Sequence, residues 1–248
     1  MRRQKKVFYL LFYTSKMVNK QPNRSLHRQI MFEIIHAIYT TSLADKLAFK
    51  WWTLCLFLYG LDRFSVDLDF DLVSWDIHEV FSLLENLVAK YGQIIEKTKT
   101  KIILRYPNGN YPLKLEINTR IQKHDEYEKV LFFGTPILAM KQSSMFANKL
   151  YALYQRKQTR DKVASRDLYD IRFFFKQHWE INEKLLKERS GKSLKTYLTF
   201  LQTFIPQNFD NTILLGLWEL LNEKQKYFVK NKLIAEVLSQ IDFFLWNK

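Results

Sequence analysis

The sequence predicts a mixed α/β half up to about residue 140, followed by an all-helical half. In the first half, several short runs alternate between apolar and polar residues, which is the period of a β-strand. After Ser143 the apolar residues recur at helical spacing almost to the end of the chain. The 248 residues are 47% hydrophobic, so the chain can bury a sizeable core. Six glycines and five prolines are too few for a long flexible linker, so we expect the two halves to share an interface.

The first expected element is a helix over residues 25–40, in which four isoleucines fall on one face behind a serine. A short apolar run predicts a second helix over 53–59, and an amphipathic pattern predicts a third over 76–90. Strands are expected between and after these helices, at residues 47–50, 65–72, 94–98, 101–106, 113–118 and 130–133.

We expect three parts: an N-terminal extension over residues 1–24 that can be disordered, a core over 25–140 and a helical subdomain over 141–248. The extension has basic residues before a short apolar run, as a signal peptide does, but lysines follow the run and no small-residue cleavage site is present. Translation could also start at Met17. The single cysteine, Cys55, cannot form an internal disulfide, which fits a reducing compartment. We therefore expect a cytoplasmic protein with no membrane partner, since no run of about 18 uncharged apolar residues is present.

The charge balance points to a polyanionic partner. Lysine and arginine total 39 against 25 acidic residues, a net charge of +14. A field of this sign attracts nucleic acid or nucleotide phosphate, although a basic bias kept for solubility is the alternative. Between residues 141 and 195, 14 basic residues stand against 6 acidic ones, with tyrosines among them. This composition is typical of a surface that binds RNA, although many of the aromatic residues must belong to the core.

Acidic residues alternate along the expected strand over residues 65–72. The period of two places Asp67, Asp69 and Asp71 on one side of this strand. Two carboxylates in this arrangement can bind Mg²⁺, but alternating acids are also the ordinary solvated face of a strand. Glu116 lies on another expected strand, and an adjacent position would complete a group of three metal ligands.

Two further carboxylates, Asp167 and Asp170, share a face at the start of an expected helix. One interpretation is a functional pair. The other is that acids in a first turn are simply favoured by the helix dipole.

Three segments, in order, resemble the AbiEii nucleotidyltransferase family, the toxins of type IV toxin–antitoxin and phage abortive-infection systems. The first runs from FKWWTL (residues 49–54) to YGLDRFSVDLDF (residues 59–70). The second is ANKLYALYQR (residues 147–156), and the third is RDLYDI (residues 166–171). The resemblance implies a nucleotidyltransferase-like α/β core followed by a helical subdomain, with the active site in the cleft between them.

The resemblance also implies roles for particular residues. Asp67, Asp69 and Glu116 would bind two Mg²⁺ or Mn²⁺ ions. Lys149 would reach the triphosphate of an NTP, and Asp167 would lie close to the reaction centre. The remaining residues expected around the nucleotide are Trp51, Trp52, Thr53, Arg63, Ser65, Arg156 and Asp170.

Several family members transfer nucleotides to the 3′ end of tRNA, so the resemblance implies the same reaction here. The net charge of +14 suits an RNA substrate. The resemblance further implies a cognate antitoxin, which in such systems is normally a transcriptional regulator.

One motif position departs from the family. The family has two glycines where this chain has Trp51 and Trp52, and glycines there let the backbone approach a triphosphate at a helix N-terminus. Three explanations are open. The protein is an inactive relative that binds RNA or a partner, or it binds its nucleotide differently, or the tryptophans are a translation artefact. UGA encodes glycine in some bacterial lineages and tryptophan in others, so the wrong code table would produce this pair.

Overall fold

The computed structural model describes residues 23–74, 76–109, 111–209 and 213–247. Most of the expected extension over residues 1–24, including the alternative start at Met17, lies outside the described residues. Its last two residues belong to the first helix, because Arg24 begins the helix and the side chain of Asn23 caps it.

The first half of the chain folds into a sheet with helices. Its elements follow the chain in the order α2 (Arg24–Tyr39), β1 (Leu47–Lys50), α3 (Trp51–Leu58), β2 (Asp67–Leu72), α4 (Ile77–Val88), β3 (Gln93–Lys97), β4 (Lys101–Arg105), β5 (Leu113–Asn118), β6 (Tyr127–Phe132) and β7 (Thr135–Met140).

The regular elements described after Met140 are all helical, as the sequence predicts. They are α5 (Gln142–Arg160), α6 (Ser165–Lys176), α7 (Glu183–Ser190), α8 (Leu194–Asn208), the 3₁₀ helix η1 (Trp218–Leu220) and α9 (Glu223–Trp246). None of the helices in the described ranges is long and apolar enough to cross a membrane.

The seven strands form one mixed sheet in the order β3-β4-β5-β2-β1-β7-β6. The strand β2 lies at its centre, parallel to β5 on one side and antiparallel to β1 on the other. The pair β1 and β7 is also parallel, and the other neighbours are antiparallel. A mixed α/β sheet followed by a helical region is the fold class that the sequence predicts.

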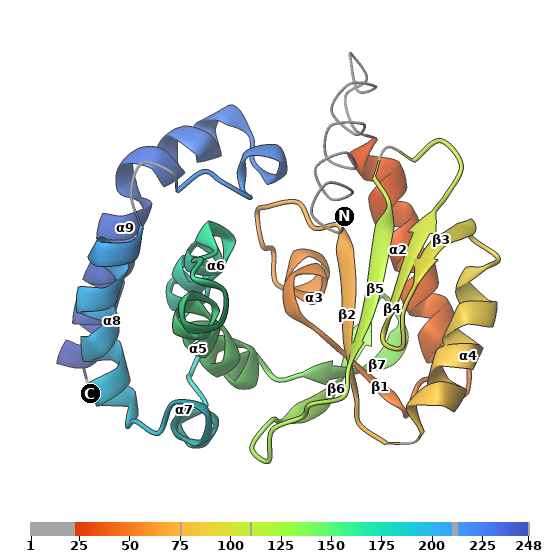
Figure 1. Cartoon of the computed structure of the whole chain (residues 1–248), viewed down its shortest axis with the longest axis horizontal. Helices are drawn as coiled ribbons and strands as arrows, with labels where there is room; N and C mark the ends of the chain where they lie inside the picture. Colours follow the sequence, from red (N-terminus) through yellow and green to blue (C-terminus); the bar gives the residue numbers. More distant parts are fainter. Residues whose placement is uncertain (1–22, 75, 110, 210–212, 248) are drawn as a thin grey trace, which may run out of the picture.

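The two faces of the sheet differ in character, and this difference positions the site. Leu68 and Phe70 of β2 are fully buried, and the helices α2 and α4 lie on that side of the sheet (Figure 1). The alternate residues Asp67, Asp69 and Asp71 project from the other face, on the side of α3, α5 and α6 (Figure 1). The polar face of the sheet therefore looks toward the helical half of the chain.

Several bounds differ from the expected elements: β2 begins at Asp67 and β6 at Tyr127, rather than at residues 65 and 130. The strand β7 is absent from the prediction, because its sequence TPILAM alternates poorly and contains Pro136, a residue that disfavours strands. In the structure Pro136 pairs with Leu131 of the edge strand β6, and β1 meets β7 further along, at Ala139. Helix α3 begins two residues earlier than expected, at Trp51, which directly follows β1.

Candidate active site

Two rows of polar side chains cover the centre of the polar face. Strands β2 and β5 run parallel in register, so each residue of one row has a neighbour in the other. The rows are Asp67, Asp69 and Asp71 on β2, and Lys114, Glu116 and Asn118 on β5.

Asp67 and Asp69 are half-buried carboxylates that face the helical half. Burial, and secondly the negative charge of Asp67, raise the pKa of Asp69 to about 6. The ammonium of Lys114 lies 3.5 Å from Oδ2 of Asp67. Asp67 therefore already accommodates a cation, and the carboxylate oxygens of both aspartates are hard donors of the kind that Mg²⁺ and Mn²⁺ prefer.

Glu116 is turned toward Lys114, with Nζ of the lysine 2.9 Å from its Oε2. Partial burial acts in the opposite direction, but Lys114 holds the pKa of Glu116 below its usual value. Within the described residues, no three carboxylate, imidazole or thiol groups converge closely enough to hold a metal ion. The structure thus brings Asp67 and Asp69 together on one strand face, while Lys114 stands between Asp67 and Glu116.

Asp71, the third aspartate of β2, is fully buried and occupied by structural partners. Its Oδ1 accepts hydrogen bonds from the ammonium of Lys50 at 2.5 Å and from the amide of Asn118 at 2.6 Å. Its Oδ2 accepts one from the hydroxyl of Tyr127 at 3.0 Å. These contacts hold β1, β2, β5 and β6 together, and they anchor Lys50 at the floor of the site.

Thr53 and Ser65 are buried beside the start of β2, and neither lines the pocket described below. The Thr53 hydroxyl donates to Oγ of Ser65 at 2.9 Å and to the backbone carbonyl of Asp67. These two expected nucleotide-binding residues therefore support the backbone that carries Asp67.

Arg63 and Asp170 are also buried, and they bind each other. The structure places both outside the lining of the pocket. Burial raises the pKa of Asp170, although Arg63 and Lys149 act against this effect.

Lys149 and Asp167 form a buried ion pair in the helical half, with Nζ 2.6 Å from Oδ1. The other oxygen of Asp167 lies 2.7 Å from Nε of Arg156. Burial would raise the pKa of Asp167, but these two cations outweigh it and leave that pKa below its usual value. Burial lowers the pKa of Lys149 to about 8.

Trp51 and Trp52 lie at the floor of the pocket, next to the lysines expected to bind phosphate. Their rings stack with centroids 5.7 Å apart, and the ammonium of Lys149 lies 3.1 Å from the centroid of Trp52. The Trp52 indole therefore covers Lys149. Trp51 has a φ of 66°, a left-handed conformation that glycine adopts freely and a bulky residue adopts at a cost. The backbone at residue 51 thus has the conformation of the glycine expected from the family pattern.

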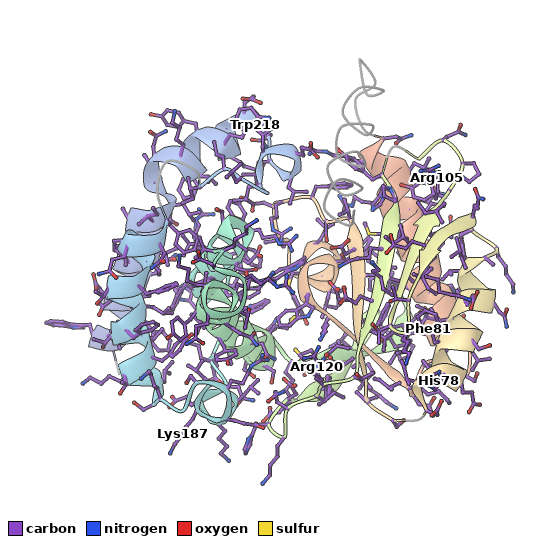
Figure 2. All side chains as sticks on the ribbon, viewed as in Figure 1. His78, Phe81, Arg105, Arg120, Lys187 and Trp218 are labelled. Carbon is purple, nitrogen blue, oxygen red and sulfur yellow. The ribbon has the colours of Figure 1, made fainter. Side chains whose placement is uncertain are left out.

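A pocket of about 610 Å³ separates the polar face of the sheet from the helical half. The charged residues on its sheet side are of both signs. The acidic ones are Asp67, Asp69 and Glu116, and the basic ones are Lys50, Lys114 and Arg120. Figure 2 shows Arg120 in the space between the two halves. The charged residues on the helical side are all basic: Lys149, Arg156, Arg160, Arg166 and Arg189.

Several pocket residues were not identified from the sequence. Lys114 lies two residues before Glu116, so strand periodicity places it on the same face and could have identified it. Lys50 immediately precedes Trp51 within the first family motif. Arg160 lies four residues after Arg156, one helical turn further along α5, whereas Arg120 and Arg189 give no local signal.

Comparison with known proteins agrees with this geometry. The family model described as nucleotidyl transferase AbiEii toxin, type IV TA system, matches residues 34–239. No curated protein matches the sequence.

Three solved structures share the fold. The protein JHP933 from Helicobacter pylori has a TM-score of 0.63 and 21% identity, covering 92% of this chain and 94% of its own. A second Helicobacter pylori structure has a TM-score of 0.62 and 20% identity, covering 92% and 97%. An antigenic nucleotidyltransferase-like protein from Paracoccidioides brasiliensis has a TM-score of 0.51 and 16% identity, covering 72% and 90%. At these identities the structures show a shared fold alone, and the family model assigns the family. The chain belongs to the AbiEii nucleotidyltransferase toxin family of type IV toxin–antitoxin systems.

Proposed function

We propose that this protein transfers a nucleoside monophosphate from an NTP to the 3′ end of an RNA, with tRNA as the acceptor. The proposal rests on one observation. Asp67 and Asp69 on β2 lie across one pocket from a group of arginines on α5, α6 and α7, namely Arg156, Arg160, Arg166 and Arg189. Carboxylates suit the divalent cation of a nucleotide, and the arginines suit phosphates.

The proposed reaction is a displacement at the α-phosphorus of the NTP. A ribose hydroxyl oxygen of the acceptor forms a bond to this phosphorus, its proton leaves to solvent, and the bond to pyrophosphate breaks. Asp67 and Asp69 are the residues that would hold Mg²⁺ or Mn²⁺, which would neutralise the negative charge that develops on the phosphate oxygens.

The basic residues divide by depth. Lys149 and Lys50 are buried at the floor beside the Trp pair, where the family has its triphosphate-binding glycines. Arg120 and Arg160 are exposed, and no carboxylate among the described residues is within ion-pair distance of either side chain. The floor therefore suits the triphosphate, and the exposed arginines suit the phosphate backbone of a longer acceptor.

The Trp pair supports a second candidate function, that of an inactive relative that binds RNA or a partner. Trp52 lies over Lys149, and Trp51 occupies the floor where the family has glycine. If both tryptophans are present in the cell, they fill space that a triphosphate needs. If they are misread glycines, Lys149 faces the pocket directly. A cognate antitoxin, as the family name implies, and a cytoplasmic location are parts of the same proposal.

Transfer of label to total tRNA tests the proposal. The purified protein is incubated with Mg²⁺, tRNA and each α-labelled NTP, both as sequenced and with Trp51→Gly and Trp52→Gly combined. Label on tRNA from either version supports the enzyme, and the preferred NTP identifies the donor. Label only from the glycine version means that the Trp pair blocks the site. No label from either folded version, beside a working control transferase, favours the binding protein.

A further inference from the structure

The position of Lys114 among the carboxylates has a consequence for the number of metal ions. Lys114 is the β5 neighbour of Asp67, and Glu116 is the β5 neighbour of Asp69. The four side chains share one face, so they occupy the corners of a small quadrilateral on adjacent strands. The ammonium of Lys114 lies 3.5 Å from Asp67 and 2.9 Å from Glu116. The ammonium therefore lies between Asp67 and Glu116, two of the three carboxylates that a pair of metal ions would need.

Lys114 differs in this respect from the other lysines around the site. Lys101 on β4 is the register partner of Glu116, but its ammonium is paired with Glu96 at 2.5 Å. Lys50 is paired with the buried Asp71. The described carboxylates within ion-pair distance of Lys114 are those of Asp67 and Glu116, both of which belong to the candidate metal group.

A divalent ion bound between Asp67 and Glu116 would have to displace the ammonium of Lys114. The metal ion and the ammonium of Lys114 would compete for the same carboxylate oxygens. Like charges a few ångströms apart also repel strongly where water is partly excluded. An ion on Asp67 and Asp69 meets the ammonium of Lys114 only at its longer contact, 3.5 Å from Asp67, and leaves the 2.9 Å pair of Lys114 with Glu116 in place.

We propose that Lys114 supplies one of the two positive charges at these carboxylates, so that the free protein binds a single divalent cation, on Asp67 and Asp69. Glu116 then holds the lysine in place and is not a metal ligand. This inference deepens the proposed function and rests on it for the meaning of the site, but the metal count can be measured without any nucleotide or RNA.

Titration with Mn²⁺, followed by the electron paramagnetic resonance signal of the free ion, tests the proposal. The wild-type protein is expected to bind one Mn²⁺, and Asp67→Asn to lose it. Lys114→Met removes the competing charge and is expected to bind two, while Lys114→Arg keeps the charge and should bind one. Lys101→Met is the matched control, since it removes the same charge from the neighbouring strand without touching Asp67, and it should bind one.

Two ions on the wild-type protein would overturn the proposal, as would one ion on both the wild type and Lys114→Met, or none on the wild type. Circular dichroism establishes that each variant is folded, and Lys114→Gln replaces Lys114→Met if the latter is not. Since the titration contains no NTP or RNA, its result does not depend on transfer. An absence of transfer with the expected ion counts would count against the proposed function alone.

Discussion

Arg63 and Asp170 form a buried, bidentate ion pair that joins the loop before β2 to helix α6. Nε of the arginine lies 2.7 Å from Oδ1 of the aspartate, and Nη2 lies 3.0 Å from Oδ2. One residue belongs to the α/β half and the other to the helical half. The pair therefore fixes the strand that carries Asp67 relative to the helix that carries Asp167, on opposite sides of the pocket.

Replacing one member of this pair should destabilise the fold strongly. In Asp170→Leu the guanidinium of Arg63 stays buried without its partner, and we expect a loss of about 3–5 kcal/mol in the free energy of unfolding. Urea unfolding followed by circular dichroism measures this loss. The double variant Arg63→Met with Asp170→Leu leaves no unpaired arginine and should lose clearly less. Equal losses in the single and double variants would contradict a dominant role for the ion pair.

The sequence predicts the fold well because its signals are local. Alternation over residues 65–72 reflects one apolar and one polar sheet face, and the structure confirms that Asp67, Asp69 and Asp71 share the polar one. The strand β7 is not predicted, because its sequence alternates poorly and contains Pro136, and because its pairing with β1 joins Phe49 and Ala139, which are distant in sequence.

The site could be predicted only in part, for the same reason. The family motifs include Arg63 and Asp170, but their pairing across 107 positions is a tertiary contact. Sequence spacing also cannot show that Lys114 forms ion pairs with both Asp67 and Glu116, because these contacts depend on the register of two parallel strands. The roles proposed for these residues remain predictions.

The backbone at Trp51 offers a direct test of its positive φ. Alanine is normally preferred to glycine in a helix, but at a φ of 66° the side chain of alanine meets the backbone and glycine does not. We therefore expect Trp51→Gly to be more stable than Trp51→Ala by about 1 kcal/mol. Thermal or urea unfolding of the two variants measures the difference. A more stable alanine variant would rule out a left-handed conformation at this residue.

Removing the indoles should open the floor of the pocket to nucleotide. Trp51→Gly combined with Trp52→Gly uncovers Lys149, and we expect NTP affinity in the presence of Mg²⁺ to rise at least about tenfold, the effect of roughly one charge-assisted contact. Isothermal titration calorimetry measures the affinity. Trp246→Gly, an exposed position on α9, is the control and should change nothing. An unchanged affinity in the double variant would mean that the tryptophans do not obstruct the nucleotide.

The ionised carboxylate of Asp69 should destabilise the folded protein at neutral pH. Its pKa is raised to about 6 in the folded protein, so between about pH 4 and pH 6 the folded state holds more protons than the unfolded state. Stability contributed by this residue therefore falls as pH rises through that range, and the cost persists above it. We expect Asp69→Asn to be more stable than the wild type by about 1–2 kcal/mol at pH 7.5, with little difference near pH 4. Urea unfolding without divalent ions measures this. A constant difference at both pH values would contradict the raised pKa.

The central claim is that Asp67 acts in nucleotide transfer to tRNA, and the rate of label transfer by Asp67→Asn tests it most directly. The assay uses whichever version of the protein is active, with Asp242→Asn, an exposed acid on α9, as the matched control. Since the metal charge on the phosphate is worth several kcal/mol, we expect Asp67→Asn to be at least about a hundredfold slower and Asp242→Asn to keep the full rate. An Asp67→Asn variant that transfers label at the control rate would contradict the account.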